Sequence, residues 1–152
     1  MARWAASLIL TGMPTVHRVD HANRIVLVRA YGVLTDEDVF TFQHTVWSQP
    51  EVAGYNELGD MTYVTDIAIP SIHRVRDLAM TAAEMDPSDA EAKFAIVAPE
   101  DLGYGLGRMF QAYREMEKAS KKEVGVSRTL AEAFAWLAIA QPPAMPQVPK
   151  SA

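Results

Sequence analysis

The chain has 152 residues, of which 49% are hydrophobic and 22% are charged, and its net charge is −5 with no cysteine. A chain of this length can bury the core of one domain, and its acidic balance argues against a sequence-independent nucleic-acid binder, which needs a basic face. The absence of cysteine excludes disulfides, thiol nucleophiles and cysteine metal sites, and it fits a reducing, cytoplasmic location.

The two ends of the chain differ in composition from its centre. Residues 1–14 hold a short apolar run behind a single arginine, well below the roughly 20 apolar residues of a membrane span, and we expect a flexible extension. Residues 140–152 hold four prolines and predict a disordered tail. The sequence therefore predicts one domain over residues 15–139 and no integral membrane segment.

The predicted elements begin with two strands and a helix. Residues 16–19 and 25–31 are rich in β-branched side chains and flank a cluster of turn-forming residues. They predict an antiparallel hairpin whose second strand ends at Gly32. Thr35 and Asp38 have the spacing of a capping box, in which each side chain accepts the backbone N–H of the other residue. This arrangement predicts a helix that begins directly after Thr35.

Strands and helices alternate through the rest of the chain. Residues 58–64, 94–98 and 123–126 form β-rich runs, Pro70 is expected to begin a helix, and Thr129 begins a second capping box before the last helix. A further helical pattern lies between the last two of these strands. The order β-β-α-β-α-β-α-β-α predicts an α/β fold: a mixed, mostly parallel five-stranded sheet with an N-terminal antiparallel hairpin and four helices.

A glycine-rich stretch follows the run at residues 94–98. Strand, glycine-rich turn and helix in this order are where α/β proteins commonly bind anions, because helix-terminal N–H groups point outward there. The spacing is G-x-G-x-G instead of the G-x-G-x-x-G of dinucleotide sites, and no Walker-type lysine follows, which argues against a nucleotide. We expect Gly103 and Gly105 to supply unusual backbone angles and Gly107 to allow close helix–sheet packing.

Arg108 is expected in the first turn of the helix that follows. Its guanidinium could hold a carboxylate or phosphate there, or it could pair with Asp60, Asp66 or Asp101. Tyr104 could stack on a ligand or cover the edge of the core. Asp60 and Asp66 lie at and beyond a strand end, where two carboxylates could do acid–base work if burial split their pKa values, or could cap turns. The four histidines have no metal-ligand spacing, so no metal and no cofactor are expected.

Four stretches, in this order, resemble the SpoIIAA-like family of small bacterial proteins, which are relatives of the STAS domain and share a general fold with lipid-binding CRAL-TRIO domains. They are residues 25–39, with a strand and Gly-x-Leu-Thr-x-x-Asp; residues 58–64, with a strand and an aspartate; residues 94–110, with a strand and Gly-x-x-Arg-Met-aromatic; and residues 129–137, with Glu-Ala-x-x-Trp-Leu. The resemblance implies a (βα)n superhelix that serves as a binding or regulatory module.

The resemblance also bears on phosphorylation. STAS domains of the anti-anti-sigma type are switched by phosphorylation of a serine just after an aspartate. Asp66 is present in this chain, but Ile67 and Ala68 occupy the serine positions, so no phosphorylation is expected there.

These patterns favour a non-enzymatic binding or regulatory module that acts through a protein partner. One alternative is a carrier or sensor of a lipid-like or small anionic ligand near the turn from Gly103 to Arg108, and another is a small hydrolase or transferase. The interaction module predicts an exposed apolar patch around the second helix and no enclosed cavity. The carrier predicts an apolar pocket of at least a few hundred Å³ between helices and sheet, and the enzyme needs a polar cleft with two titratable groups of shifted pKa. A homodimer formed through methionine-rich faces or a sheet edge is a further possibility that the sequence does not decide.

Overall fold

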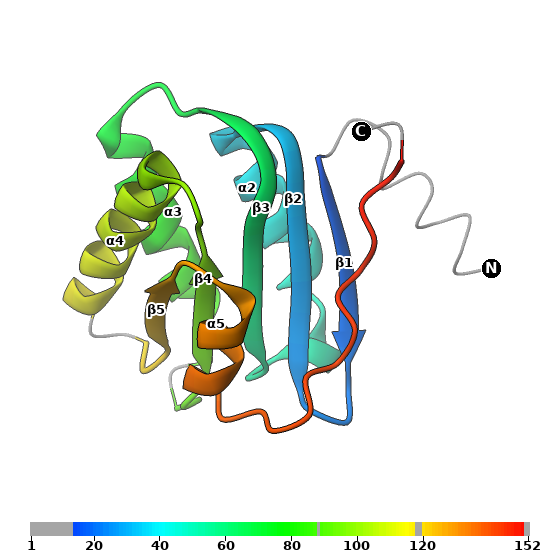
Figure 1. Ribbon diagram of the computed structural model, residues 1–152. Helices are drawn as coiled ribbons and strands as arrows, with labels where there is room; N and C mark the ends of the chain where they lie inside the picture. Colours follow the sequence, from blue (N-terminus) through cyan, green and yellow to red (C-terminus); the bar gives the residue numbers. More distant parts are fainter. Residues whose placement is uncertain (1–13, 88, 118–119, 151–152) are drawn as a thin grey trace.

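Helices cover both faces of a five-stranded sheet in the computed structural model, which describes residues 14–87, 89–117 and 120–150 (Figure 1). The strands lie in chain order, and they are β1 (Thr15–Asp20), β2 (Ile25–Thr35), β3 (Asn56–Ala68), β4 (Lys93–Val97) and β5 (Glu123–Ser127). The helices of these residues are α2 (Asp36–Val46), α3 (Ile72–Met85), α4 (Asp101–Met116) and α5 (Leu130–Trp136), with a 3-10 turn η1 (Pro50–Val52). Strand β1 is antiparallel to β2 and the other pairs are parallel, which confirms the predicted sheet.

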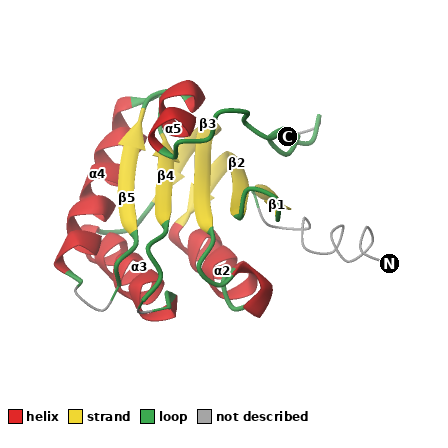
Figure 2. Ribbon diagram, turned by 90° about the horizontal axis from the view of Figure 1, so that it is seen from below, coloured by secondary structure: helices red, strands yellow, loops and turns green. Residues whose placement is uncertain are grey.

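Two helical layers enclose the sheet unequally. Helices α2, α3 and α4 cover one face, whereas α5 and the C-terminal segment cover the other (Figure 2). The alternation within β2 follows this division, because Leu27 packs with Phe134 of α5 and Val28 packs with Phe42 of α2. Both faces of the central strands are therefore buried, as in other largely parallel sheets. Within the described ranges, no helix has the length and apolar character needed to cross a membrane.

Both predicted capping boxes are confirmed. The Thr35 hydroxyl accepts the Asp38 N–H at 3.1 Å and begins α2, and the Thr129 hydroxyl accepts the Glu132 N–H at 3.2 Å and begins α5. Pro70 does not begin α3, because Ser71 is the cap and the first helical residue is Ile72.

Strand β2 does not end at Gly32. This glycine has a φ of 66°, and two register shifts between β2 and β3 surround it, after which the strands pair again as far as Thr35 and Ala68. Strand β4 pairs with β3 only up to Asp60. Residues 31–35 and 63–68 therefore form a two-stranded extension beyond the rest of the sheet, here called the β2–β3 arm (Figure 1).

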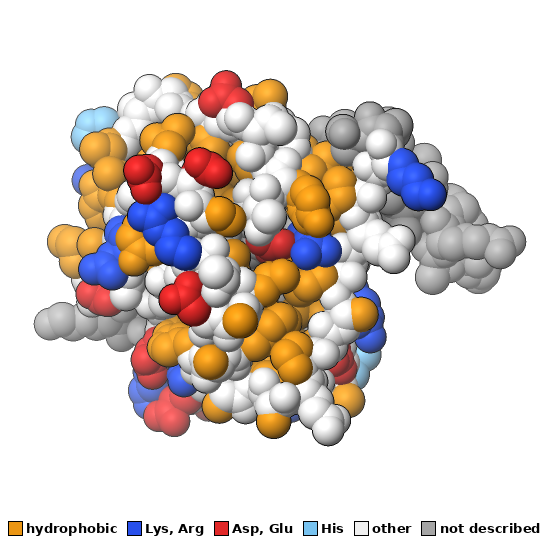
Figure 3. All heavy atoms as spheres, viewed as in Figure 1, with side chains coloured by type: hydrophobic (Ala, Val, Ile, Leu, Met, Phe, Trp, Pro, Cys, Tyr) orange, Lys and Arg blue, Asp and Glu red, His pale blue; other side chains and the backbone are white. Residues whose placement is uncertain are grey.

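Residues 140–150 form no helix or strand, and they lie against the domain. Arg18 donates to the carbonyl of Ala144 at 2.6 Å, Arg29 donates to that of Pro146 at 3.2 Å, and Met145 packs on the core beneath α5. On this face of the molecule, apolar side chains gather around α5 and the beginning of the segment (Figure 3). Apolar contacts and hydrogen bonds from two arginines thus hold the proline-rich segment against the domain, although it has no secondary structure. The flexible extension predicted at the N-terminus falls mainly on residues 1–13, which lie outside the residues that the structure describes.

Candidate functional site

The glycine-rich stretch is the beginning of a helix and not a turn. Helix α4 begins at Asp101, so Gly103, Gly105 and Gly107 are helical, and none of them has a left-handed φ. A Cβ on Gly103 would lie 3.3 Å from the Met61 side chain, and one on Gly107 would lie 3.1 Å from Val126. The packing role predicted for Gly107 is confirmed, and Gly103 has the same role. The prediction that Gly103 and Gly105 have unusual backbone angles is wrong.

Arg108 lies about two turns into α4 and is exposed, so it cannot reinforce the N–H groups at the beginning of the helix. The expected partners are bound elsewhere, because Asp101 pairs with Arg128 at 2.9 Å and Asp60 pairs with Arg29 at 2.8 Å. The guanidinium of Arg128 also lies over the Tyr104 ring, 4.0 Å from its centre. The structure therefore does not assemble Arg108, Tyr104 and the glycines into an anion site.

Asp60 and Asp66 are also kept apart. Asp60 is buried on the α5 side of the sheet, where its carboxylate accepts from Arg29 and from the Thr62 N–H at 3.0 Å. Asp66 is about 20 Å further along the extended strand, exposed, and accepts the N–H of Ile67 at 2.8 Å. Asp60 thus forms a buried ion pair and Asp66 accepts a hydrogen bond within β3, so the structure neither brings the two carboxylates together nor places them at a helix cap.

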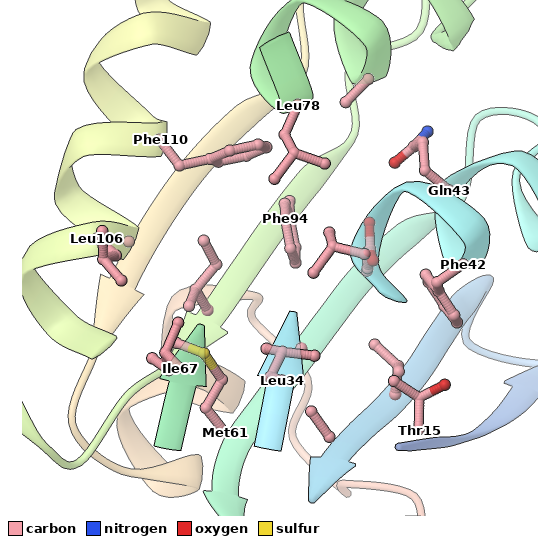
Figure 4. Close-up of a pocket in the computed structure, with 18 of the residues that line it drawn as sticks. Thr15, Leu34, Phe42, Gln43, Met61, Ile67, Leu78, Phe94, Leu106 and Phe110 are labelled. Atoms are coloured by element: carbon pink, nitrogen blue, oxygen red, sulfur yellow. The ribbon is translucent and has the colours of Figure 1, made fainter. Parts of the chain in front are cut away.

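A cavity of about 170 Å³ lies between the sheet and the layer formed by α2, α3 and α4 (Figure 4). Its walls are mostly aliphatic and aromatic side chains, which come from both the strands and the three helices. Those that enclose it most visibly are Leu34, Phe42, Met61, Leu78, Phe94 and Phe110. This apolar space is the one that the carrier interpretation predicted, although its volume is below the expected few hundred Å³.

Small residues make room for the cavity. Ala30, Gly59, Ala82 and Gly107 line it from β2, β3, α3 and α4, where larger side chains would fill the space. A Cβ on Gly59 would already lie 3.2 Å from the Phe94 ring. Four small residues far apart in the sequence thus border the cavity, and Gly59 and Gly107 also allow neighbouring side chains to approach closely.

The β2–β3 arm lines one end of the cavity. Leu34 and Ile67 come from the arm, and Figure 4 shows both lying near Met61. Ile67 occupies the position at which the family resemblance places a phosphorylated serine, and here it contributes an apolar wall. None of the side chains labelled at this end of the cavity in Figure 4 carries a charge.

The other end of the cavity meets charged groups. Along β3, Glu57 points to the same face as Gly59 and Met61 because side chains alternate, and all three line the cavity. Lys122 Nζ lies 3.8 Å from Glu57 Oε1 and 3.9 Å from Asp86 Oδ1. Asp86 is also bound by Arg114. Glu57, Asp86, Arg114 and Lys122, whose side chains are each at most 8% exposed, form what we call the buried charge cluster.

Burial shifts the pKa values of two members of the cluster towards their neutral forms. Removal from water raises the pKa of Glu57, and this shift is opposed by Lys122 and the nearby Trp47. Removal from water lowers the pKa of Lys122, and this shift is opposed by the negative charges of Glu57 and Asp86. Because the pKa of Glu57 is raised in the folded chain, this group stabilises the fold fully at pH values below its pKa in the unfolded chain, near 4.5. The stabilisation is lost as the pH rises through the pKa that Glu57 has in the folded chain.

Sequence reasoning predicted, as one alternative, an apolar pocket between the helices and the sheet, but it did not identify the residues that line it. It missed the buried charge cluster, because it looked for a site at the opposite ends of the strands. One signal was available: Arg114 continues the buried stripe of α4 at helical spacing after Gly103, Gly107 and Phe110. An arginine on such a stripe indicates a buried acidic partner. The described residues contain no group of three or more histidine, aspartate or glutamate side chains placed to hold a metal ion.

No protein-family model matches the chain, and no curated protein matches its sequence. Its structure is similar to the crystal structure of an uncharacterized protein from the DUF3478 family with a SpoIIAA-like fold, from Shewanella loihica PV-4. The TM-score is 0.52 at 17% sequence identity, and the match covers 81% of this chain and 93% of that chain. At this identity the likeness is one of fold. The chain has a SpoIIAA-like fold, as the resemblance of its sequence implied.

Proposed function

We propose that the chain is a binding module whose cavity beneath α2, α3 and α4 holds a small apolar ligand. A SpoIIAA-like fold suggests a STAS-like module, and the observation that carries the proposal is the apolar cavity of about 170 Å³. An engineered apolar cavity of about 150 Å³ binds benzene, whereas sites for drug-sized ligands measure about 300–1,000 Å³. The ligand is therefore about the size of a substituted benzene ring or a short acyl chain.

Toluene is a suitable probe, and Ala82→Leu is the variant that tests it. Ala82 lines the cavity from α3 and is 4% exposed, and leucine is nearly as good a helix former as alanine. The larger side chain fills part of the space, so we expect toluene affinity to fall about tenfold or more. The free energy of unfolding should rise by about 1 kcal/mol because apolar contacts replace the void. Methyl NMR titration and urea unfolding measure the two quantities.

The matched control is Ala112→Leu, which makes the same change at an exposed position of α4. It should leave toluene binding unchanged. The proposal fails if wild-type protein gives no saturable shifts with toluene, or if Ala82→Leu binds toluene as wild type does.

Interaction with a protein partner is a second candidate, favoured by exposed apolar side chains on α3. Ile72 is 52% exposed and Met80 is 39% exposed, in the region where the sequence predicted an interaction patch. Homodimerisation is the form of this candidate that needs no unknown partner. We expect sedimentation equilibrium to give a dimer that Ile72→Glu converts to monomer, and a monomer at all concentrations would contradict it.

A further inference from the structure

The cavity has one polar end, and its ionisable group is Glu57. Thr15, Gln43 and Glu57 are polar residues of the lining, and Thr15 lies away from the other two, at the level of Ala30 along the sheet. Asp60 also borders the cavity, but its carboxylate is bound by Arg29 on the opposite face of β3. Glu57 is 6% exposed, and Phe94 on the neighbouring strand is its register partner. A carboxyl group therefore lies beside the aromatic wall of the cavity.

The carboxyl of Glu57 has unused capacity to accept hydrogen bonds. Lys122 Nζ, at 3.8 Å, is beyond hydrogen-bond distance and lies 4.0 Å from the centre of the Trp47 ring. Trp47 Nε1 is buried near the same carboxyl and lowers the pKa of Glu57, but it makes no hydrogen bond of normal geometry among the described residues. Asp86 differs, because it accepts from Arg114 and from the Ser120 hydroxyl. Buried carboxyl oxygens normally accept hydrogen bonds, so Glu57 has room for a donor from a ligand.

The two ends of the cavity orient a ligand. Figure 4 shows Gln43 and Leu78 at the end opposite to Met61 and Ile67, which offers apolar contact. The Gln43 amide makes a weak contact of 3.7 Å with Met85 Sδ, which leaves its oxygen available to a polar group. A ligand would place its polar atom beside Glu57 and its apolar body towards Met61.

We propose, on the basis of the ligand-binding function above, that the cavity selects small apolar molecules carrying one hydrogen-bond donor, a hydroxyl or a protonated amine, which Glu57 accepts. Carboxylates are rejected because Glu57 and Asp86 already share Lys122, so a third negative charge would have no cation of its own in a water-poor environment. A plain hydrocarbon still fits, but it forgoes the hydrogen bond. The ligand class is therefore a short alcohol or amine on an apolar body.

Four probes of nearly equal size test this selectivity: toluene, benzyl alcohol, benzylamine and benzoate. For wild-type protein, we expect benzyl alcohol or benzylamine to bind about tenfold more tightly than toluene, and benzoate not to bind. The better of the two donors identifies the head group. In Glu57→Gln, the ratio of the benzyl alcohol or benzylamine affinity to the toluene affinity should shrink to about threefold or less.

Carboxyl ¹³C NMR of wild-type protein gives a second readout that needs no variant. The Glu57 carboxyl resonance should shift with benzyl alcohol or benzylamine and not with toluene. Equal binding of all four probes, an unchanged preference in Glu57→Gln, or a Glu57 resonance that ignores the donors would overturn the selectivity and leave the apolar site intact. Failure of all four probes to bind would instead overturn the proposed function.

Discussion

Arg114→Met is expected to lower the free energy of unfolding by about 3–5 kcal/mol, a large part of the about 5–15 kcal/mol available to a domain. The Arg114 side chain is 3% exposed and that of Asp86 is 8% exposed, so the variant leaves a carboxylate in the interior without its main partner. Lys122 cannot compensate fully, since its ammonium lies 3.9 Å from Asp86 and is shared with Glu57. Urea unfolding followed by circular dichroism measures the loss.

Two controls separate burial from the change of residue type. Arg128→Met breaks a pair with Asp101, whose side chain is 97% exposed, and it should cost less than about 1 kcal/mol. The double variant Arg114→Met with Asp86→Leu removes both charges and should be more stable than Arg114→Met alone. If Arg114→Met were no more costly than Arg128→Met, the buried charge cluster would not stabilise the fold as described.

Arg29→Met is expected to have a comparable cost, about 3–5 kcal/mol, and to release the C-terminal segment as well. Arg29 binds Asp60, whose side chain is fully buried, and also donates to the carbonyl of Pro146. The variant therefore leaves an unpaired interior carboxylate and removes one of the bonds that hold residues 140–150. Urea unfolding gives the loss of stability, and limited proteolysis shows whether the segment is cut faster.

Arg18→Met is the matched control for this effect. Arg18 also holds the C-terminal segment, through the carbonyl of Ala144, but its hydrogen bond is exposed and buries no carboxylate. We expect faster cleavage of the segment with a loss of less than about 1 kcal/mol in stability. Equal losses for the two variants would mean that the Arg29–Asp60 pair has no special weight.

Local signals were sufficient for the sheet and for several helix boundaries. The capping boxes at Thr35 and Thr129 use residues three positions apart, so a short window of sequence contains the whole device. The strand at residues 94–98 was correct to within one residue because a buried parallel strand is a short apolar run. The extension of β2 beyond Gly32 was missed, because a glycine in a strand marks a bulge as readily as an end.

The candidate site could not be predicted in the same way because distant residues build it. Gly103 and Gly107 look like a turn in sequence, and only their contacts with Met61 and Val126 explain glycines within a helix. The cavity depends on small residues on four separate elements, whose spacing has no period. Glu57 and Lys122 are 65 positions apart and meet only through the parallel pairing of β3, β4 and β5.

The most direct test of the central claim is to locate bound toluene through intermolecular nuclear Overhauser effects in wild-type protein. If toluene occupies the cavity, its protons should give cross-peaks to the methyl groups of Leu34, Met61 and Leu78, which line it, and none to Leu27 on the α5 side of the sheet. Cross-peaks confined to exposed side chains such as Ile72 and Met80, or no cross-peaks under saturating toluene, would contradict a ligand site between the sheet and its three helices.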